Sequence, residues 1–296
     1  MVNDNKFPLT DSRVCGLFSS YINHDRIALA VSGGRDSMAL MYLVYRWKAH
    51  LAINIEIEVL TVNHNLRKAA EDECLFVQKI AKNYGFRHKV LTWEHEHIET
   101  SIQEKARNAR YQLMLDYARE ENIHTILTAH TSDDNIETFI MRLAKGSGLD
   151  GLKSINEIRH EDGIRIERPI LSLSRSLTTE ILRSTGNEWV DDPTNDDERF
   201  ERVKIRNNIS SLSSFNISSD NLTKTIQRLS RAHESIIFFT NLVSEELVEL
   251  SELGHANVNF DKLRHYPKEI ILRVFAKALT DINGGNVSLS SLESVF

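Results

Sequence analysis

The stretch ALAVSGGRDSMALMYL, from Ala28 to Leu43, decides the fold. An apolar, strand-like run ends at Ser32, two glycines and a polar cluster follow, and a second apolar run has helical character. The spacing fits neither Gly-x-x-x-x-Gly-Lys-Ser/Thr nor Gly-x-Gly-x-x-Gly. Glycines let the backbone approach a ligand closely, and the start of a helix offers unpaired N–H groups. We therefore interpret residues 32–37 as an anion-binding loop, although a bare Gly-Gly pair would also suit an ordinary tight turn.

Asp36 stands out in this loop, because a carboxylate repels a phosphate. A bridging Mg²⁺ ion removes that conflict, since magnesium is usually bound by one or two carboxylates together with phosphate oxygens. Ser32 and Ser37 add hydroxyl donors on either side of the loop. The sequence therefore predicts a phosphate-binding loop in which Asp36 is the metal ligand.

Strand and helix patterns alternate through the first half of the chain. The strands are predicted over 26–31, 55–62, 87–93 and 123–129, and the helices over 36–47, 69–84, 101–121 and 133–143. This alternation predicts an α/β fold, a Rossmann-like parallel sheet with helices on both faces. In such sheets ligands bind beyond the carboxyl ends of the strands, where loops and helix N-termini converge.

The pattern changes after about Asn208. The segment SSLSSFNISSDN, from Ser210 to Asn221, is rich in serine and asparagine and is typical of a linker. From Leu222 onward the pattern is mainly helical. We therefore predict a sheet-containing domain over residues 1–210, a linker over 211–221 and a smaller C-terminal helical domain over 222–296.

The composition is that of a soluble globular protein, with 41% hydrophobic and 26% charged residues in a chain of 296. No apolar run reaches the roughly 18 residues of a membrane span, and the N-terminal segment lacks a secretory signal pattern. Cys15 and Cys74 are far apart and do not form a pair that would indicate zinc, an iron–sulfur cluster or a disulfide framework. We expect a cytoplasmic protein with no membrane partner.

Charge is unevenly distributed in this chain, whose net charge is −6. Five of the eight residues from Asp191 to Glu198 are acidic. The next segment, 199–231, is basic and holds two acids against seven lysines and arginines. A solvated helix face explains such a strip, and the functional alternative is a surface that contacts nucleic-acid phosphates. The basic residues are Arg199, Arg202, Lys204, Arg206, Lys224, Arg228 and Arg231.

Two groups of basic side chains come from the second strand end and the third helix. His64 and Arg67 follow the second strand, although a lone histidine is more often structural than catalytic. Arg107, Arg110 and Tyr111 lie three or four residues apart and so share one helix face. Two guanidinium groups on one face suit phosphates or a nucleobase, and simple solvation is the alternative.

Three acids, Asp133, Asp134 and Glu137, lie in the first turns of the helix after the fourth strand. Their spacing brings Glu137 near both aspartates. Helix capping accounts for one acid, and it explains Asp133 as well as ligand binding does. Three carboxylates beside a phosphate-binding loop need a cation, which is either a metal ion or an ammonium group.

Together these residues resemble the N-type ATP pyrophosphatase group, whose members carry the Ser-Gly-Gly-x-Asp-Ser loop and cleave ATP between its α and β phosphates. Within that group, five stretches over about residues 25–210 resemble the tRNA(Ile)-lysidine synthase family. One departure is ERVKIRNN, where that family more usually has Arg-Asn-x-Ile/Val-Arg. Residues 211–296 resemble the family's helical domain only loosely. The five stretches are VNHNLR, EKARNARY, TAHTSDDNIETFIMRLAKGSGLDGL, RPIL and DDPTNDDERFERVKIRNNI.

The resemblance implies a two-step reaction of ATP with free L-lysine and a tRNA(Ile) that has a CAU anticodon. ATP adenylates the C2 oxygen of the wobble cytidine and releases pyrophosphate. The amino group of lysine then attacks C2 and displaces AMP. An anticodon loop supplies the unstacked base that such chemistry needs. A homodimer is compatible with this interpretation.

The resemblance also implies a role for each candidate residue. Asp36, Arg107 and Arg110 are expected to be catalytic, with Mg²⁺ on Asp36. Lysine is expected to bind Asp133, Asp134 and Glu137. ATP is expected to bind Ser32, Gly33, Gly34, Arg35, Asp36, Ser37 and His64. The tRNA is expected to bind Arg199, Arg202, Arg206, Arg228 and Arg231.

Three other functions share some of these features. A tRNA thiolation enzyme of the same fold would in many cases need a cysteine pair, which this sequence lacks. A synthetase that uses ammonia would need a glutaminase domain or partner. A module that only senses adenine nucleotides would not need the acidic cluster and would release no pyrophosphate.

Overall fold

The computed structural model describes residues 7–65, 69–95, 102–191, 201–251, 253–285, 287 and 289–294. Its contacts divide the chain into two compact units, and each is described by itself. The first unit comprises Met1–Lys145 and Ser154–Thr223, and the second comprises Gly146–Lys153 and Lys224–Phe296.

The first unit is built on a six-stranded sheet. Its strands are β1 (Arg26–Ala30), β2 (Glu56–Asn63), β3 (Arg87–Thr92), β4 (Thr125–Leu127), β5 (Ile158–Glu161) and β6 (Ile164–Glu167). They lie in the order β3-β2-β1-β4-β6-β5. All neighbours are parallel except β5, which pairs antiparallel with β6. The predicted Rossmann-like α/β fold is therefore confirmed, with one antiparallel edge strand added.

The β5–β6 hairpin is the part of the sheet that the sequence analysis missed. Asp162 and Gly163 connect the two strands, and both have positive φ angles, of 51° and 80°. Two consecutive positive φ angles are the mark of the type I′ turn, for which Asp-Gly is a preferred pair. The signal for this hairpin was therefore present in the sequence.

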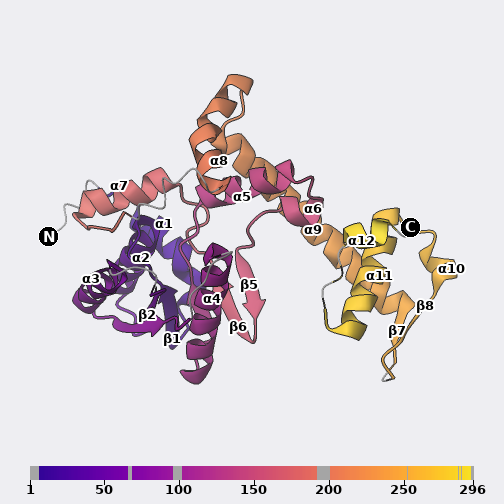
Figure 1. Ribbon diagram of the computed structural model, residues 1–296, viewed down its shortest axis with the longest axis horizontal. Coiled ribbons are helices and arrows are strands. Elements are labelled where there is room, and N and C mark those ends of the chain that lie inside the picture. The colour runs from indigo at the N-terminus through magenta and orange to yellow at the C-terminus, as the bar shows by residue number, and fades with distance from the viewer. Residues whose placement is uncertain are drawn as a thin grey trace. The chain divides into compact units, whose positions relative to one another are not determined.

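Helices cover both faces of the sheet (Figure 1). The first unit contains the helices α1 (Asp11–Phe18), α2 (Arg35–Leu51), α3 (Ala69–Asn83), α4 (Ile102–Glu120), α5 (Ser132–Ala144), α7 (Arg175–Thr185) and α8 (Glu201–Ile209), with the 3₁₀ helices η2 (Ser19–Tyr21) and η4 (Ser210–Phe215). Ile27 and Leu29 of β1 pack in one core with α1, α2, α3 and α7, whereas Ala28 packs in the other with α4. Successive strand residues point to opposite faces, so a short apolar run supplies both cores.

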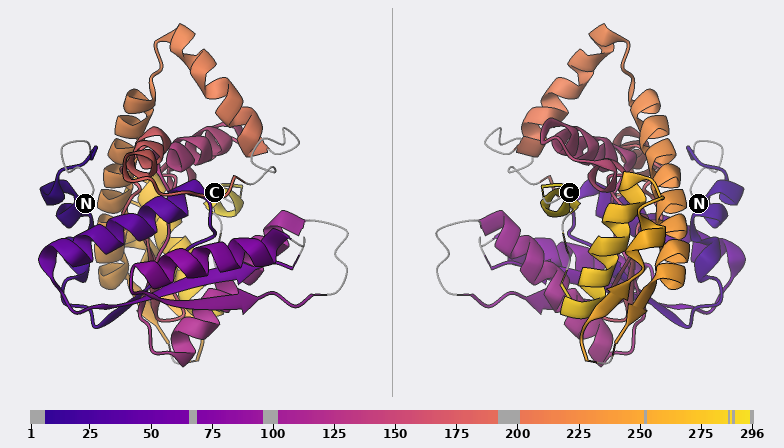
Figure 2. Two further views of the ribbon diagram at one scale, coloured as in Figure 1. Left: turned by 90° about the vertical axis from the view of Figure 1, so that its left-hand side faces the viewer. Right: turned by 90° about the vertical axis from the view of Figure 1, so that its right-hand side faces the viewer.

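The second unit is mainly helical. Its elements are α6 (Leu149–Leu152), α9 (Ser219–Leu247), β7 (Val248–Leu250), β8 (Ala256–Val258), α10 (Phe260–Leu263), α11 (Lys268–Asn283) and α12 (Leu289–Glu293). Its core includes Val243, Leu247, Leu263 and Val274. Helix α9 begins in the first unit, where α8 leads into it through η4 and the chain turns back (Figure 2). None of the helices in the described ranges is both long and apolar enough to cross a membrane.

Candidate functional site

The anion-binding loop lies where the strand order reverses, because β1 pairs with both β2 and β4. Gly33 has a φ of +83°, a conformation that side-chain-bearing residues rarely adopt, so this position favours glycine. The Ser37 hydroxyl donates to the Gly34 carbonyl at 2.8 Å, and the Ser32 N–H donates to Ser37 Oγ at 3.2 Å. Gly34 caps α2 without a side-chain bond. The first N–H groups of α2 are therefore available to an anion.

Asp36 is held by side chains from α7 as well as by its own neighbour. Its Oδ1 accepts a hydrogen bond from the Thr178 hydroxyl at 2.6 Å and lies 3.4 Å from Arg35 Nε. Its Oδ2 lies 3.7 Å from Arg175 Nε. The loop carboxylate is thus connected to a helix about 140 positions further along the chain.

The three acids of α5 all contact Arg175, the first residue of α7. Its guanidinium reaches Glu137 Oε1 at 2.9 Å and Asp134 Oδ1 at 3.1 Å. Its backbone N–H donates to Asp133 Oδ2 at 2.8 Å. The Glu137 side chain is only 1% exposed and that of Arg175 14%, so this is a buried ion network. The predicted acidic cluster exists, and a cation from the same chain occupies it.

Asp133 does not cap its own helix, α5, although the sequence suggested that it does. The acid that caps α5 is Asp134, whose Oδ2 accepts from the Thr131 N–H at 2.8 Å in a capping box. Asp133 instead caps the N-terminus of α7, because its carboxylate reaches across to the Arg175 N–H. Burial by itself would raise the pKa of Asp134, but Arg175 and the Thr131 hydrogen bonds outweigh it and lower the pKa. Asp134 is therefore ionised at neutral pH.

Two arginines that the sequence analysis assigned to tRNA lie at this cluster. Arg206 Nε donates to Glu137 Oε1 at 2.9 Å, and Arg202 donates to Thr138 Oγ1 at 3.1 Å. Charge pattern alone could not show that both point at α5. The predicted tRNA-binding set is therefore divided between two regions.

The remaining members of that set lie elsewhere. Lys224, Arg228 and Arg231 are exposed on α9 and make no ion pair with a residue that the structure describes. Their spacing of four and three residues places them on one side of the helix. Arg199 is outside the described residues.

Arg107 and Arg110 lie on α4, and Arg110 is near His64 at the end of β2, whose pKa its charge lowers. The guanidinium carbon of Arg107 lies 5.2 Å from the centroid of the Tyr111 ring, as their shared helix face predicts. Burial and the charge of Arg107 lower the pKa of Arg110, and no described carboxylate pairs with either arginine. Arg107 is exposed and Arg110 half-buried, so an anionic ligand would offset the cost of withdrawing the Arg110 charge from water.

His64 also lies at the end of β2, and Arg67 is outside the described residues. Burial lowers the pKa of His64 to about 4, and the charges of Arg110 and His95 add to this effect. Its buried Nδ1 has no hydrogen-bond partner among the described residues. His64 is therefore neutral at pH 7 and able to donate or accept a hydrogen bond.

His130 and Arg168 were not identified from the residues themselves. Burial lowers the pKa of His130 to about 4, helped by the charges of Arg168, Arg107 and Arg202. Arg168 follows β6 and donates to the Asn156 carbonyl at 2.7 Å. Recognition of the Asp-Gly hairpin would have revealed β6, and with it Arg168 and Arg175 beyond its carboxyl end.

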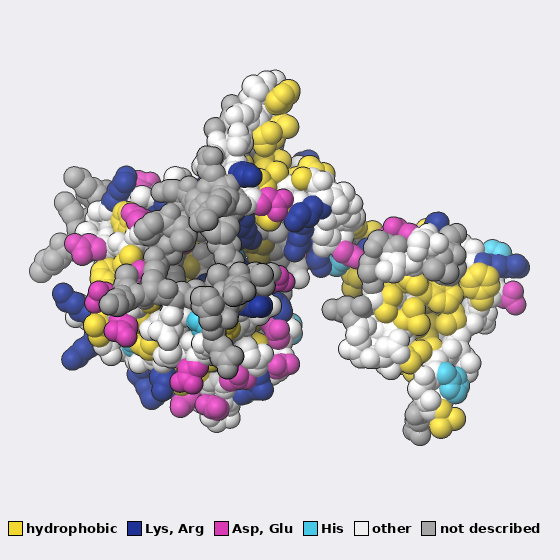
Figure 3. All heavy atoms as spheres, viewed as in Figure 1, with side chains coloured by type: hydrophobic (Ala, Val, Ile, Leu, Met, Phe, Trp, Pro, Cys, Tyr) yellow, Lys and Arg dark blue, Asp and Glu magenta, His cyan; other side chains and the backbone are white. Residues whose placement is uncertain are grey.

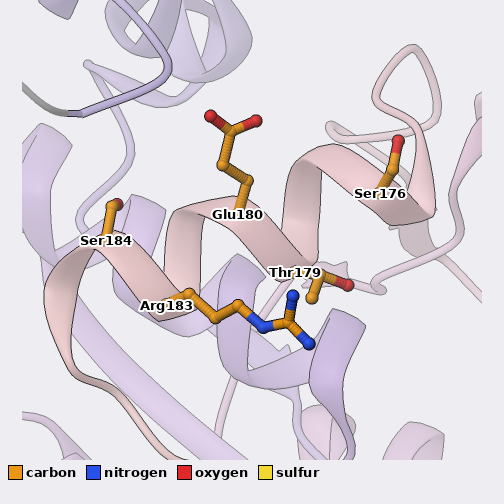
Figure 4. A pocket seen from close by; sticks show the side chains of 5 residues that line it. All are labelled: Ser176, Thr179, Glu180, Arg183 and Ser184. Carbon is orange, nitrogen blue, oxygen red and sulfur yellow. The ribbon is translucent and has the colours of Figure 1, made fainter.

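Helix α7 also borders a hollow of about 460 Å³ that is separate from this cluster. Figure 4 shows that its lining side chains all come from this one helix. Arg175 and Thr178, which contact Asp36, are not among its lining residues. The lining residues are Ser176, Thr179, Glu180, Arg183 and Ser184.

The chain matches the PP-loop domain family over residues 10–212. It is 33% identical to the tRNA(Ile)-lysidine synthase of Wolbachia pipientis wMel over 281 residues, which cover 94% of this chain and 65% of the relative. It is 33% identical to the tRNA(Ile)-lysidine synthase of Bradyrhizobium sp. (strain BTAi1 / ATCC BAA-1182) over 302 residues, covering 99% of this chain and 84% of the relative. The chain therefore spans between about two thirds and five sixths of the length of these curated relatives.

A solved structure with a similar fold is the U34-tRNA thiolase NcsA from Methanococcus maripaludis with its [4Fe-4S] cluster. The TM-score is 0.62 at 16% sequence identity, and the match covers 74% of this chain and 76% of that one. At this identity the likeness concerns the fold alone. Since the sequence relatives are lysidine synthases, the alternative of a tRNA thiolation enzyme is not favoured.

Proposed function

Because the chain belongs to the tRNA(Ile)-lysidine synthase family of PP-loop proteins, we propose that it joins free L-lysine to C2 of the wobble cytidine of a CAU-anticodon tRNA(Ile). ATP is converted to AMP and pyrophosphate. One observation carries this proposal, namely that the phosphate-binding loop and a buried acidic cluster meet through Asp36 and Arg175. ATP cleavage needs the loop, and an amine substrate needs the acids. A module that only senses nucleotides would need the loop but not the acids.

The reaction has two covalent steps. The C2 oxygen of cytidine attacks the α-phosphorus of ATP, and the bond to the β-phosphate oxygen breaks to release pyrophosphate. The lysine nitrogen then attacks C2, the C2–O bond breaks, AMP leaves with that oxygen, and the nitrogen loses a proton. Each step moves charge onto a phosphate oxygen.

ATP binding is assigned to the loop and to the basic residues at the end of β2. The N–H groups at the start of α2 and the hydroxyls of Ser32 and Ser37 would hold the leaving pyrophosphate. Arg107 and Arg110 would stabilise the charge that develops on the phosphates. The absence of a described carboxylate beside these two arginines supports this role.

Asp36 is the residue that would hold Mg²⁺. The described residues contain no group of three or more acids, histidines or cysteines arranged to hold a metal by themselves. A magnesium ion shared with phosphate oxygens needs only one or two carboxylates, so Asp36 fits this requirement. The ion would supply positive charge to the phosphates, while Thr178 orients the carboxylate through its 2.6 Å hydrogen bond.

Lysine binding is assigned to Asp134 and Glu137, with Asp133 in support. A free amino acid with a methylene stem is recognised mainly by its charged ends. Burying an ammonium group without partners is costly, and Glu137 provides a carboxylate that is almost fully buried. Arg202 and Arg206 are assigned to the support of this lysine site, because Arg206 holds Glu137 and Arg202 holds its neighbour Thr138 by hydrogen bonds.

Docking of tRNA is assigned to the basic side of α9, formed by Lys224, Arg228 and Arg231. Exposed arginines and lysines on one helix side can contact successive phosphates without reading sequence. Arg199 remains a candidate for the same role.

A cytoplasmic homodimer completes the proposal. Hydrophobic side chains gather on the face of the second unit that Figure 3 shows. The exposed apolar residues of the second unit include Phe238, Phe239 and Leu242 of α9, which would be covered in a dimer. Sedimentation velocity of the purified chain measures the oligomeric state directly.

The experiment that tests the activity mixes the protein with ATP, Mg²⁺, labelled lysine and an unmodified CAU-anticodon tRNA(Ile) transcript. Label in the RNA, with one AMP per lysine transferred, is the expected result. A transcript in which the wobble base is uridine serves as the control and should acquire no label. Pyrophosphate release without label in the RNA would contradict lysine as the second substrate.

A further inference from the structure

Arg175 contacts carboxylates in both halves of the proposed site. Its Nε lies 3.7 Å from Asp36 in the phosphate-binding loop, and its two terminal nitrogens reach Glu137 and Asp134 on α5. Among the described residues, Arg35 pairs only with the loop acid and Arg206 only with Glu137. Arg175 is therefore the described cation that connects the two groups of acids.

The positive charge of Arg175 is disfavoured by the dipole of its own helix and stabilised by the neighbouring acids. It is the first residue of α7, where the helix dipole disfavours a positive charge. Burial would lower its pKa, but Asp134, Glu137 and Asp36 outweigh burial and raise the pKa. The carboxylates, not the helix, therefore hold the guanidinium in place.

Arg175 also occupies the position where an incoming ammonium group would bind. Glu137 Oε1 accepts from both Arg175 and Arg206 at 2.9 Å, while Oε2 accepts only from Arg206, at 3.4 Å. Asp134 Oδ1 is taken by Arg175, and its Oδ2 by the Thr131 backbone and hydroxyl. A lysine ammonium that binds Glu137 Oε1 and Asp134 Oδ1 must therefore replace Arg175 there.

We propose that Arg175 is a positioning residue that couples ATP binding to lysine binding, an inference that rests on the proposed function. The phosphates of ATP attract the guanidinium toward the 32–37 loop. Asp134 and Glu137 then lose one cation and accept the ammonium group of lysine instead. By thermodynamic linkage, lysine raises the affinity for ATP by the same factor. The coupling favours lysine binding after ATP has bound.

The test is calorimetric titration of lysine into the full chain, with and without Mg²⁺ and a non-hydrolysable ATP analogue. The analogue should lower the lysine Kd of the wild type about tenfold, within the usual range of such couplings. In Arg175→Gln the analogue should change the lysine Kd less than about twofold. Arg206→Gln is the matched control, because it also loses a Glu137 partner but not the link to Asp36. The lysine Kd of this variant should differ from that of the wild type, and the analogue should still lower that Kd about tenfold.

Arg175→Lys covers the case in which Arg175→Gln does not fold. Its single ammonium group retains a charge for the acids but cannot span Asp36 and α5 at once. In Arg175→Lys the analogue should also change the lysine Kd by less than about threefold. Retention of tenfold coupling in either Arg175 variant, or its absence in the wild type, overturns the inference. If the wild type binds no lysine under either condition, the proposed lysine site itself is wrong, which distinguishes the two failures.

Discussion

Arginines in two regions of this chain have opposite surroundings. Arg175, 14% exposed, and Arg206, 34% exposed, lie at the acidic cluster and pair with carboxylates at about 3 Å. Arg228 and Arg231 stand exposed on α9 and have no ion pair with a described residue. Within the basic segment 199–231, burial and partners, more than residue type, separate Arg206 at the acidic cluster from Arg228 and Arg231, for which we propose tRNA docking.

The energetics of the two regions differ in the same way. Removing one partner from a buried, hydrogen-bonded ion pair leaves an uncompensated charge and is strongly destabilising. Removing an exposed, unpaired cation costs the fold little. Substitutions at the site should therefore lower the stability of the fold in addition to changing the chemistry, whereas substitutions on α9 should act on tRNA affinity and its salt dependence alone.

The largest effect is expected from Asp36→Ala. The variant loses the carboxylate that would hold Mg²⁺ at the phosphates, so pyrophosphate release should fall at least about a hundredfold. The measurement is pyrophosphate release from ATP in the presence of tRNA. Asp116→Ala, which removes an exposed acid of α4, is the control and should release pyrophosphate at the wild-type rate. Near wild-type release by the Asp36 variant would show that this acid only begins a helix.

The next largest effect is expected from Glu137→Gln. This change keeps the shape and removes the charge, so the KM for lysine should rise by roughly ten- to a hundredfold, as for a lost bond to a charged group. Adenylation of the tRNA, measured with a trap for the adenylated intermediate, should continue. Asp133→Asn should have a smaller effect on KM, because Asp133 contacts a backbone N–H. Loss of adenylation with normal lysine binding would instead identify the cluster as a metal site.

A moderate effect is expected when Arg228 and Arg231 are both changed to alanine. The tRNA Kd should rise about tenfold at moderate salt, and the slope of log K against log salt should become shallower by up to about two. ATP affinity should stay unchanged. Arg183→Ala, an exposed arginine of α7, is the control and should leave the slope as it is. An unaltered slope in the double variant would mean that this side of α9 is only solvated.

The smallest effect concerns pH. The pKa of His64 is about 4 in the folded chain, below its ordinary value of 6.5, so the unfolded chain binds the proton more readily. The stabilising contribution is therefore complete above pH 6.5 and is lost as the pH falls toward 4. Between pH 7 and pH 5.5 the free energy of unfolding should drop by about 1 kcal/mol on account of His64. Denaturant titrations at both pH values measure this, and His64→Asn should show a correspondingly smaller drop.

Local patterns predicted the parts of the molecule that are built from neighbouring residues. The 32–37 loop and the clustering of Asp133, Asp134 and Glu137 follow from a strand-to-helix turn and from helical spacing. Arg175 could not be predicted, because its contact with Asp36 joins residues far apart in the sequence. Arg206 was placed with the tRNA residues because a charge run does not show which face of a helix is buried.

We propose that the acidic cluster binds lysine and that the basic side of α9 binds tRNA. The most direct test measures the rate of labelled lysine transfer to a CAU-anticodon tRNA(Ile) as the tRNA concentration is raised. The wild type, the Arg228→Ala/Arg231→Ala variant and Glu137→Gln are compared at one fixed lysine concentration below the KM. The account predicts that the α9 variant reaches the wild-type rate at saturating tRNA, whereas Glu137→Gln stays slow until lysine is raised. A wild type that transfers no label, or an α9 variant that stays slow at saturating tRNA, would contradict it.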